Sequence, residues 1–245
     1  MMRDELRRIA EPVLREVMDH PFWSGLRDGS LPGAALVHFM QQDTGHLLPT
    51  FGRAFARCAA VADHDSHTTL LSHCAFATIE SAPRLLGALA ELAPRIGVEP
   101  PAARSPIAPH THAYCSFLHA ATTTTFAAGI GTLLPIMWFH VEICGDLRKR
   151  GKPGSRYAPW IEVYDPGEET WHAVQAFLRM IDEVGERCSA TERAQLIEHF
   201  SLGMYHEWAF AEGRLRPACA SFEPGSSEWW DGAHCCTTPV EADGV

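Results

Sequence analysis

An acid and an imidazole stand three residues apart in the otherwise apolar stretch HFMQQDTGHLLPTF, at Asp43 and His46. In a helix, residues at this spacing share a face. A carboxylate on an apolar face is costly unless it is paired or hydrogen-bonded. Such a pair could do acid–base chemistry on a bound ligand. Taken alone, it is more typical of a hydrogen-bonded pair in a protein core.

Two further segments place polar groups among apolar residues. In GTLLPIMWFHVEICGD, His140 shares a helical face with Ile136. In SLGMYHEWAFAEG, Glu207 shares a face with Gly203 and Phe210. An acid beside a glycine on an apolar helix indicates room for a ligand. Each of these signals is weak by itself.

The remaining polar clusters indicate no standard site. DHDSH (63–67) has metal-ligating residue types but lies in a polar turn, and His110 and His112 lie in a proline-rich connector. The motifs HExxH, GxGxxG, GxxxxGK[ST] and GxSxG do not occur, which excludes the common zinc-protease, nucleotide-binding and α/β-hydrolase signatures. Eight cysteines include no CxxC pair, so we expect most of them to be small buried apolar side chains.

Composition limits the partners of this 245-residue chain. Thirty acidic against 20 basic residues give a net charge of −10, which argues against nucleic-acid binding because that needs clustered cations. No uninterrupted apolar stretch approaches the ~20 residues of a membrane span. The charged N-terminal segment has no apolar core typical of a secretory signal. We therefore expect a cytoplasmic protein without membrane contacts.

Apolar residues recur at helical spacing over most of the chain. Pro12 is expected to kink or split the first helix, and Gly45 with Pro49 to bend the second or divide it into collinear pieces. The β-branched run 122–125 is a weak point in the fourth. The expected helices cover 4–18, 34–62, 68–93, 113–149, 168–187 and 190–213. Strand signals are nearly absent, so the sequence predicts an all-α bundle of seven or eight helices.

The last thirty residues differ from the rest in composition. They are rich in Gly, Ser and Pro and have no periodicity, which is typical of an irregular tail. Trp229 and Trp230 are unusual there and would suit docking on a surface. We expect one helical domain over 1–215 and a tail over 216–245.

Five segments stand in an order and spacing that match one family pattern. They are HPFWSGLRDGSLPGAALVHFMQQD (20–43), HAYCSF (112–117), LLPIMWFHVEICG (133–145), WIEVY (160–164) and SLGMYHEWAF (201–210). Together they resemble the TenA/thiaminase II family over most of residues 5–213. The resemblance implies a haem-oxygenase-like helical bundle with a pocket between its helices, assembled as a dimer or, commonly, a homotetramer. Family members hydrolyse the aminopyrimidine of degraded thiamin, and some also cleave thiamin.

The resemblance also implies roles for individual residues. Asp43 occupies the position of the carboxylate that binds the pyrimidine amino group. Tyr114 and Tyr164 fall at aromatic or hydroxyl positions of the pocket. Glu207 matches a late-helix acid that is proposed to transfer protons.

This sequence departs from the family at three of its pocket positions. The usual nucleophile is a cysteine directly after LLP, where this chain has Ile136, whose side chain cannot attack carbon or take a proton. His46 and His140 replace two tyrosines. Cys144 does not substitute for the missing thiol, because it lies about 12 Å further along the helix at 1.5 Å per residue. A branch of the family lacks the cysteine and is thought to use carboxylates.

The resemblance favours a hydrolase of an aminopyrimidine or a related heteroaromatic amine. Asp43 would hold the amine through a charge-assisted hydrogen bond, Glu207 would transfer protons, and His140 or His46 would activate water. The candidate catalytic residues are therefore Asp43, Glu207 and His140. The candidate substrate-binding residues are Asp43, His46, Tyr114, Ile136, His140 and Tyr164.

Two other functions stay open. A non-catalytic binding protein would keep the pocket and lack the chemistry, which Ile136 would explain. A metal-dependent oxidase on the same fold would need Glu, Asp and His ligands from three helices. The late helix offers His199 and His206, but Gly203 stands between them where an acid is needed, and Glu80 is isolated on its helix. We expect no metal site and no cofactor.

Overall fold

Side-chain caps define where several helices begin in the computed structural model, which describes residues 1–102 and 104–213. Ser189 and Glu192 form a reciprocal capping box at the start of the last helix. Thr125 accepts a hydrogen bond from the backbone N–H of Ala128, and His20 accepts one from Phe22. These side chains satisfy N–H groups that a helix leaves without partners at its start.

The described residues form ten α-helices, one π-helical turn and one 3₁₀ turn, and contain no strand. The all-α prediction is confirmed for this part of the chain. The expected number of seven or eight helices is too low, because the segments around 21–28 and 158–164 are themselves helical. The elements are α1 (Met2–Asp19), α2 (Pro21–Asp28), α3 (Gly33–Gln42), η1 (Asp43–Leu47), α4 (Leu48–Ala60), α5 (Asp65–Leu92), η2 (Ala93–Ile96), α6 (Pro109–Ala121), α7 (Phe126–Arg150), α8 (Ala158–Tyr164), α9 (Gly167–Arg187) and α10 (Ala190–Glu212).

The predicted continuous helix over 113–149 is wrong, because the threonine run ends α6 and begins α7. The hydroxyl of Thr122 donates back to the carbonyl of Leu118, and that of Thr125 caps α7. Threonine hydroxyls that bond nearby backbone compete with the helical pattern. Pro12 does not split the first helix, since α1 continues on both sides of it.

The expected break near Gly45 and Pro49 takes the form of a π-helical turn. The N–H of Leu48 donates to the carbonyl of Asp43, five residues earlier. Pro49 stands in the first turn of α4, where its missing N–H costs least. Helices α3 and α4 are therefore two pieces joined by η1, and π-turns of this kind occur often at functional sites.

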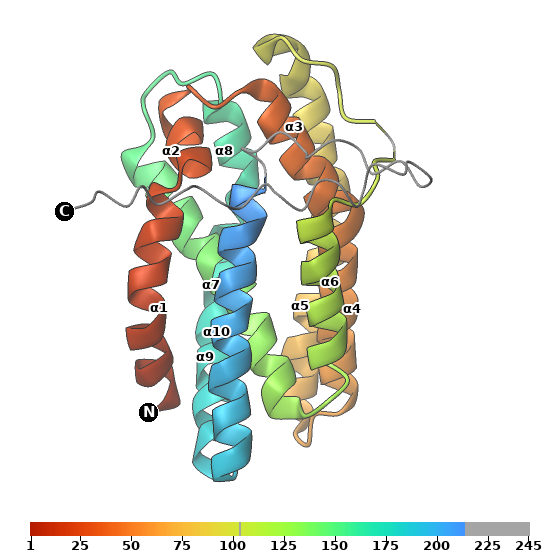
Figure 1. The fold of residues 1–245 in the computed structure, drawn as a ribbon, viewed down its shortest axis with the longest axis vertical. Helices are drawn as coiled ribbons and strands as arrows, with labels where there is room; N and C mark the ends of the chain where they lie inside the picture. The colour runs from red at the N-terminus through yellow and green to blue at the C-terminus, as the bar shows by residue number, and fades with distance from the viewer. Residues whose placement is uncertain (103, 214–245) are drawn as a thin grey trace, which may run out of the picture. The chain divides into compact units, whose positions relative to one another are not determined.

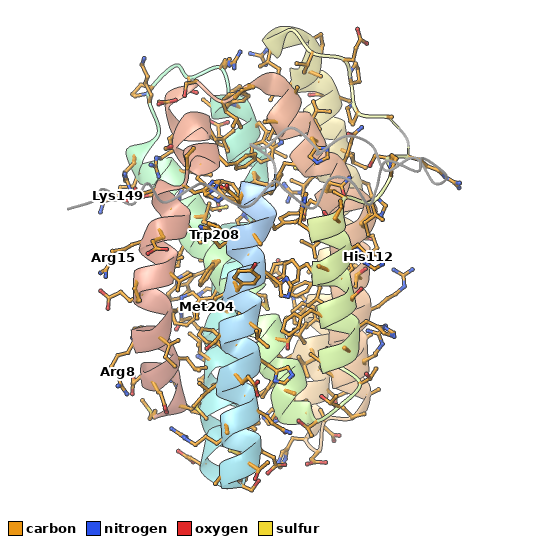
Figure 2. The ribbon with its side chains drawn as sticks, in the orientation of Figure 1. Arg8, Arg15, His112, Lys149, Met204 and Trp208 are labelled. Carbon is orange, nitrogen blue, oxygen red and sulfur yellow. The ribbon has the colours of Figure 1, made fainter. Side chains whose placement is uncertain are left out.

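Helix α10 runs between α1 and α6 and packs along α7, while α4 packs along α5 (Figure 1). Exposed side chains such as Arg8, Arg15 and His112 point outward from α1 and α6 (Figure 2). Helix α7 is long and apolar enough, by length and composition, to cross a membrane, but 67% of its most apolar window is buried. Such burial is typical of the central helix of a bundle.

Two glycines allow α7 and α10 to approach closely. A Cβ atom at Gly131 would meet the backbone carbonyl of Leu196, and one at Gly203 would lie 2.9 Å from Cγ of Pro135. The space beside Gly203 is thus filled by the Pro135 ring. The expectation that this glycine leaves room for a ligand is wrong.

The predicted tail, 216–245, lies outside the described residues together with Trp229 and Trp230. The boundary at 215 remains a prediction.

Candidate active site

A cavity of about 280 Å³ lies among the helices, and its lining includes Asp43, Ile136, His140, Tyr164 and Glu207. These residues come from η1, α7, α8 and α10. The fold therefore brings together five of the seven residues that the sequence singled out for catalysis or binding. His46 and Tyr114 are not part of the lining.

Aromatic rings form the inner wall of this cavity. Phe39 packs against Trp23, Tyr164 and Phe210, with ring centroids 5.5, 6.3 and 5.5 Å apart. The ring of Tyr164 also stacks on the ring of Trp160, with ring centroids 4.4 Å apart. Flat, fixed aromatic surfaces of this kind suit a planar heteroaromatic ligand.

Trp23 and Phe39 were missed in the sequence. Both belong to segment 20–43, which carried the family resemblance, and both are large aromatic residues near the acid at 43. That proximity was the available signal. Helical spacing alone does not distinguish a cavity wall from ordinary core.

Asp43 enters the cavity from the π-turn and is 6% exposed. It is the first residue of η1, directly after the buried Gln42. The Gln42 side chain donates to the carbonyl of Pro106 and accepts from the N–H of Ala108, both at 2.8 Å. These two bonds tie the end of α3 to the proline-rich connector and thereby hold the backbone that carries Asp43.

His46, which the sequence places in the pocket, lies outside the cavity lining. Its Nε2 is 2.9 Å from the carbonyl oxygen of Ser105, and the ring lines a separate hollow with Arg104. A π-turn rotates less per residue than an α-helix, so a spacing of three no longer places Asp43 and His46 on one face. The assumption of regular α-helix caused this error.

Glu207 projects from α10 and accepts a hydrogen bond from Tyr114 of α6, which lies outside the cavity lining. The phenolic O–H donates to Oε1 of Glu207 at 2.5 Å. Tyr114 is fully buried, and burial together with the Glu207 charge raises its pKa well above the usual value. The phenol therefore stays protonated and remains a donor. Tyr114 thus acts on the cavity through Glu207.

His140 stands on α7 beside Tyr164, with ring centroids 4.7 Å apart. Burial lowers the pKa of His140 to about 4, and a hydrogen bond to the Tyr164 backbone opposes this only in part. Its Nε2 also lies 3.6 Å from the Cys144 sulfur. The imidazole is therefore neutral at pH 7, with one N–H and one acceptor nitrogen.

Ile136 stands where the family pattern has its nucleophilic cysteine. Among the described residues, no reactive thiol takes the place of that cysteine at the cavity. Cys74 lines the cavity, but burial raises its pKa to about 12. Cys144 is buried behind His140, outside the lining, and burial raises its pKa further still. A thiol becomes a good nucleophile only as the thiolate, so both side chains are unreactive at neutral pH.

His199 and His206, the histidines that the metal-dependent oxidase hypothesis would use, lie in an aromatic stack. His206 is stacked between Tyr114 and Phe117, with ring centroids at 5.0 and 4.7 Å, and His199 stacks on Phe117 at 6.1 Å. Nδ1 of His199 is 2.8 Å from the Gln195 carbonyl. Within residues 1–102 and 104–213, no three His, Cys, Asp or Glu side chains converge as a metal site.

Comparisons with known proteins agree with this architecture. The family model described as TENA/THI-4/PQQC family matches residues 7–216. The aminopyrimidine aminohydrolase of Bacillus subtilis (strain 168) is 30% identical over 200 residues, which cover 78% of this chain and 80% of that protein. The enzyme of the same name from Halalkalibacterium halodurans is 29% identical over 194 residues, 76% of this chain and 83% of that protein.

A solved structure, a TenA homologue from P. horikoshii OT3, resembles this one with a TM-score of 0.72 at 24% identity. The match covers 87% of this chain and 98% of that one, and it concerns the fold. The haem-oxygenase-like, all-α fold predicted from the sequence is confirmed. Because the family model matches residues 7–216, which is most of the chain, the chain belongs to the TENA/THI-4/PQQC family.

Proposed function

We propose that this protein hydrolyses an aminomethyl-substituted aminopyrimidine: a hydroxyl group from water replaces the amine of the aminomethyl substituent, ammonia is released, and the ring amino group is kept. The observation that carries this proposal is that two carboxylates, Asp43 and Glu207, line one aromatic-walled cavity from different elements. The relatives named aminopyrimidine aminohydrolase support the choice of substrate.

The pyrimidine ring would lie against Tyr164 and Phe39, because aromatic faces favour offset or edge-on packing with another flat ring. Asp43 would accept a hydrogen bond from the ring amino group. A bond between a carboxylate and such a donor is roughly twice as strong as a neutral one. Asp43 therefore orients the ring so that its reacting substituent faces Glu207 and His140.

Glu207 would carry the protons of the reaction. The leaving amine needs one proton to depart as ammonia, and the attacking water must lose one to become the hydroxyl group, so the two transfers balance. The Glu207 carboxylate, held by Tyr114, can take the proton that the water loses and pass it to the leaving amine, so that it ends the turnover unchanged. The neutral His140 would accept a hydrogen bond from the water and orient it, in place of a thiol attack.

The direct test is incubation of the purified protein with aminomethyl pyrimidine at pH 6 to 9. The proposal expects hydroxymethyl pyrimidine and ammonia in equal amounts. Absence of both products across this range rules the hydrolase out.

A second candidate, a non-catalytic binding protein, is favoured by the Ile136 side chain in the cavity lining and by the raised pKa of Cys74. It predicts that hydroxymethyl and aminomethyl pyrimidine bind tightly with no turnover. Calorimetry beside the product assay separates the two functions.

We further propose a soluble, cytoplasmic homo-oligomer, a dimer or tetramer. The burial of α7 among other helices supports a soluble protein. Leu202 and Tyr205 of α10 are 42% and 59% exposed, which supports association through this face. Analytical ultracentrifugation tests the oligomeric state, and a monomer at micromolar concentration contradicts the proposed dimer or tetramer.

A further inference from the structure

Trp23 of α2 carries a hydrogen-bond donor for which the described residues offer no acceptor. Its side chain lines the cavity and is 4% exposed. The indole nitrogen Nε1 is buried and has no hydrogen-bond partner within residues 1–102 and 104–213. The large majority of buried polar side-chain atoms in folded proteins have such a partner. An unpartnered N–H on a cavity-lining residue therefore indicates that a ligand supplies the acceptor.

Three aromatic neighbours fix the plane of this indole. The Trp23 ring meets Phe22 edge-on with centroids 4.9 Å apart and Phe39 in the same manner at 5.5 Å. It stacks on Tyr164 at 6.1 Å, with 28° between the ring planes. A side chain that is rigid before binding loses little conformational entropy when a ligand arrives. The N–H is thus held ready beside the two rings, Phe39 and Tyr164, against which the pyrimidine of the proposed reaction lies.

The chemistry of indole limits which ligand atom can be its partner. An indole nitrogen donates one hydrogen bond and accepts none. An ionised carboxylate such as Asp43 only accepts, so it suits the amino group of an aminopyrimidine. The acceptors that the pyrimidine ring itself carries are its nitrogens. A ring nitrogen is therefore the ligand atom that matches Trp23.

A second tryptophan has the same kind of buried N–H in a different place. Nε1 of Trp160 also has no hydrogen-bond partner in the described part of the chain, and its ring stacks on Tyr164. Trp160, however, is not part of the cavity lining. Of these two indoles, only Trp23 can meet a ligand in the cavity, and Trp160 provides the matched control for the loss of an indole N–H.

We propose that Trp23 is a specificity-determining residue: its indole N–H donates to a ring nitrogen of the ligand while Asp43 accepts from the amino group of the same ligand. The inference rests on the proposed function for the identity of the ring. It adds the residue that distinguishes a nitrogen-containing ring from a carbocyclic ring of the same shape. A ring without an acceptor leaves the N–H unpaired, and sites built around a buried hydrogen-bonding group reject such analogues strongly.

Calorimetric binding of two probes tests this role. The first is hydroxymethyl pyrimidine, and the second is its benzene analogue, in which CH groups replace both ring nitrogens. The wild-type protein should bind the first more than about tenfold more tightly. Trp23→Phe keeps an aromatic ring and deletes the donor, so it should weaken binding of the pyrimidine about tenfold and change the affinity for the benzene analogue by less than about twofold. Trp160→Phe should leave the ratio of the two affinities as it is in wild type.

The NMR signal of the Trp23 indole proton provides a second measurement, made on the wild-type protein. The chain has seven tryptophans. The Trp23 signal is identified by its absence in Trp23→Phe or by its nuclear Overhauser effects to Phe22. Hydroxymethyl pyrimidine should move this signal downfield, as a newly formed hydrogen bond does, and the benzene analogue should not.

Four results would each overturn the role of Trp23: equal affinity of wild type for both probes, equal weakening of both by Trp23→Phe, no downfield shift of the indole signal, or no binding of hydroxymethyl pyrimidine. Failure of the proposed function looks different. It gives no turnover of aminomethyl pyrimidine, while the preference for the pyrimidine probe persists in wild type and is lost in Trp23→Phe.

Discussion

The phenolic oxygen of Tyr114 lies 2.5 Å from Oε1 of Glu207, so a fully buried side chain of α6 holds the acid of α10 at the cavity. Tyr114 is absent from the cavity lining, whereas Glu207 is part of it. The two residues therefore have separate tasks. In the proposed reaction, Tyr114 positions Glu207, and Glu207 meets the substrate.

Removing this hydrogen bond should affect turnover more than binding. Tyr114→Phe keeps the ring that stacks on His206 and deletes only the donor. Because hydrogen bonds to charged groups contribute about 1.5–3 kcal/mol, we expect kcat to fall at least tenfold with KM within about twofold. Tyr205→Phe, an exposed tyrosine of α10, is the control. A rise in KM at constant kcat would contradict a positioning role.

Asp43→Asn should weaken binding of the pyrimidine amino group. The variant keeps the shape of the side chain and loses its charge, so the dissociation constant for hydroxymethyl pyrimidine should rise about tenfold or more. Calorimetry measures this change. Asp65→Asn, on the exposed first turn of α5, should leave the affinity unchanged. Unchanged affinity in Asp43→Asn would place the amino group elsewhere.

His140 should make the protein less stable in mild acid. Its folded pKa of about 4 lies below the ordinary value of 6.5, so between these values the unfolded chain binds a proton that the folded protein does not. This contribution to stability is fully present above pH 6.5 and is lost as the pH falls to about 4. We expect a loss of about 1–3 kcal/mol, since the side chain is only half-buried.

The variant His140→Gln isolates this effect, because glutamine does not titrate. Urea unfolding of both proteins at pH 7.5 and 4.5 should give a smaller acid loss for the variant. His206, whose pKa burial also lowers, is present in both proteins and cancels in the comparison. Equal acid losses would show that His140 titrates normally.

Two glycines of α7 should respond oppositely to alanine. Gly131→Ala forces a methyl group against the Leu196 carbonyl, and such overpacking costs about 1–3 kcal/mol or more. Gly145→Ala meets nothing within 4 Å and should stabilise the helix by about 0.5–1 kcal/mol. Thermal unfolding distinguishes them. Equal melting temperatures would mean that α7 and α10 lie further apart.

Much of the fold was predictable because burial leaves a helical period in the sequence. Asp43, Ile136 and His140 became candidates chiefly through the resemblance to the TenA family, and their roles remain predictions. The helical period of the sequence could not predict the π-turn, because that turn depends on how Pro49 and its neighbours share backbone hydrogen bonds. The misplacement of His46 follows from that one feature.

Tertiary contacts explain the other differences. The space beside Gly203 is occupied by Pro135 of another helix, which no local pattern reveals. Phe76 of α5 is 64% exposed and yet contributes to the cavity lining, which no pattern in the sequence distinguishes from an ordinary surface position.

The most direct test of the account is the product assay on three proteins: wild type, Glu207→Gln, and Glu198→Gln, an exposed acid of the same helix. Each is incubated with aminomethyl pyrimidine, and hydroxymethyl pyrimidine and ammonia are quantified. We predict equal release of both by wild type and Glu198→Gln, and a rate lower by about 10²–10⁴-fold in Glu207→Gln. Equal rates in all three proteins, or no product from wild type, would contradict the account.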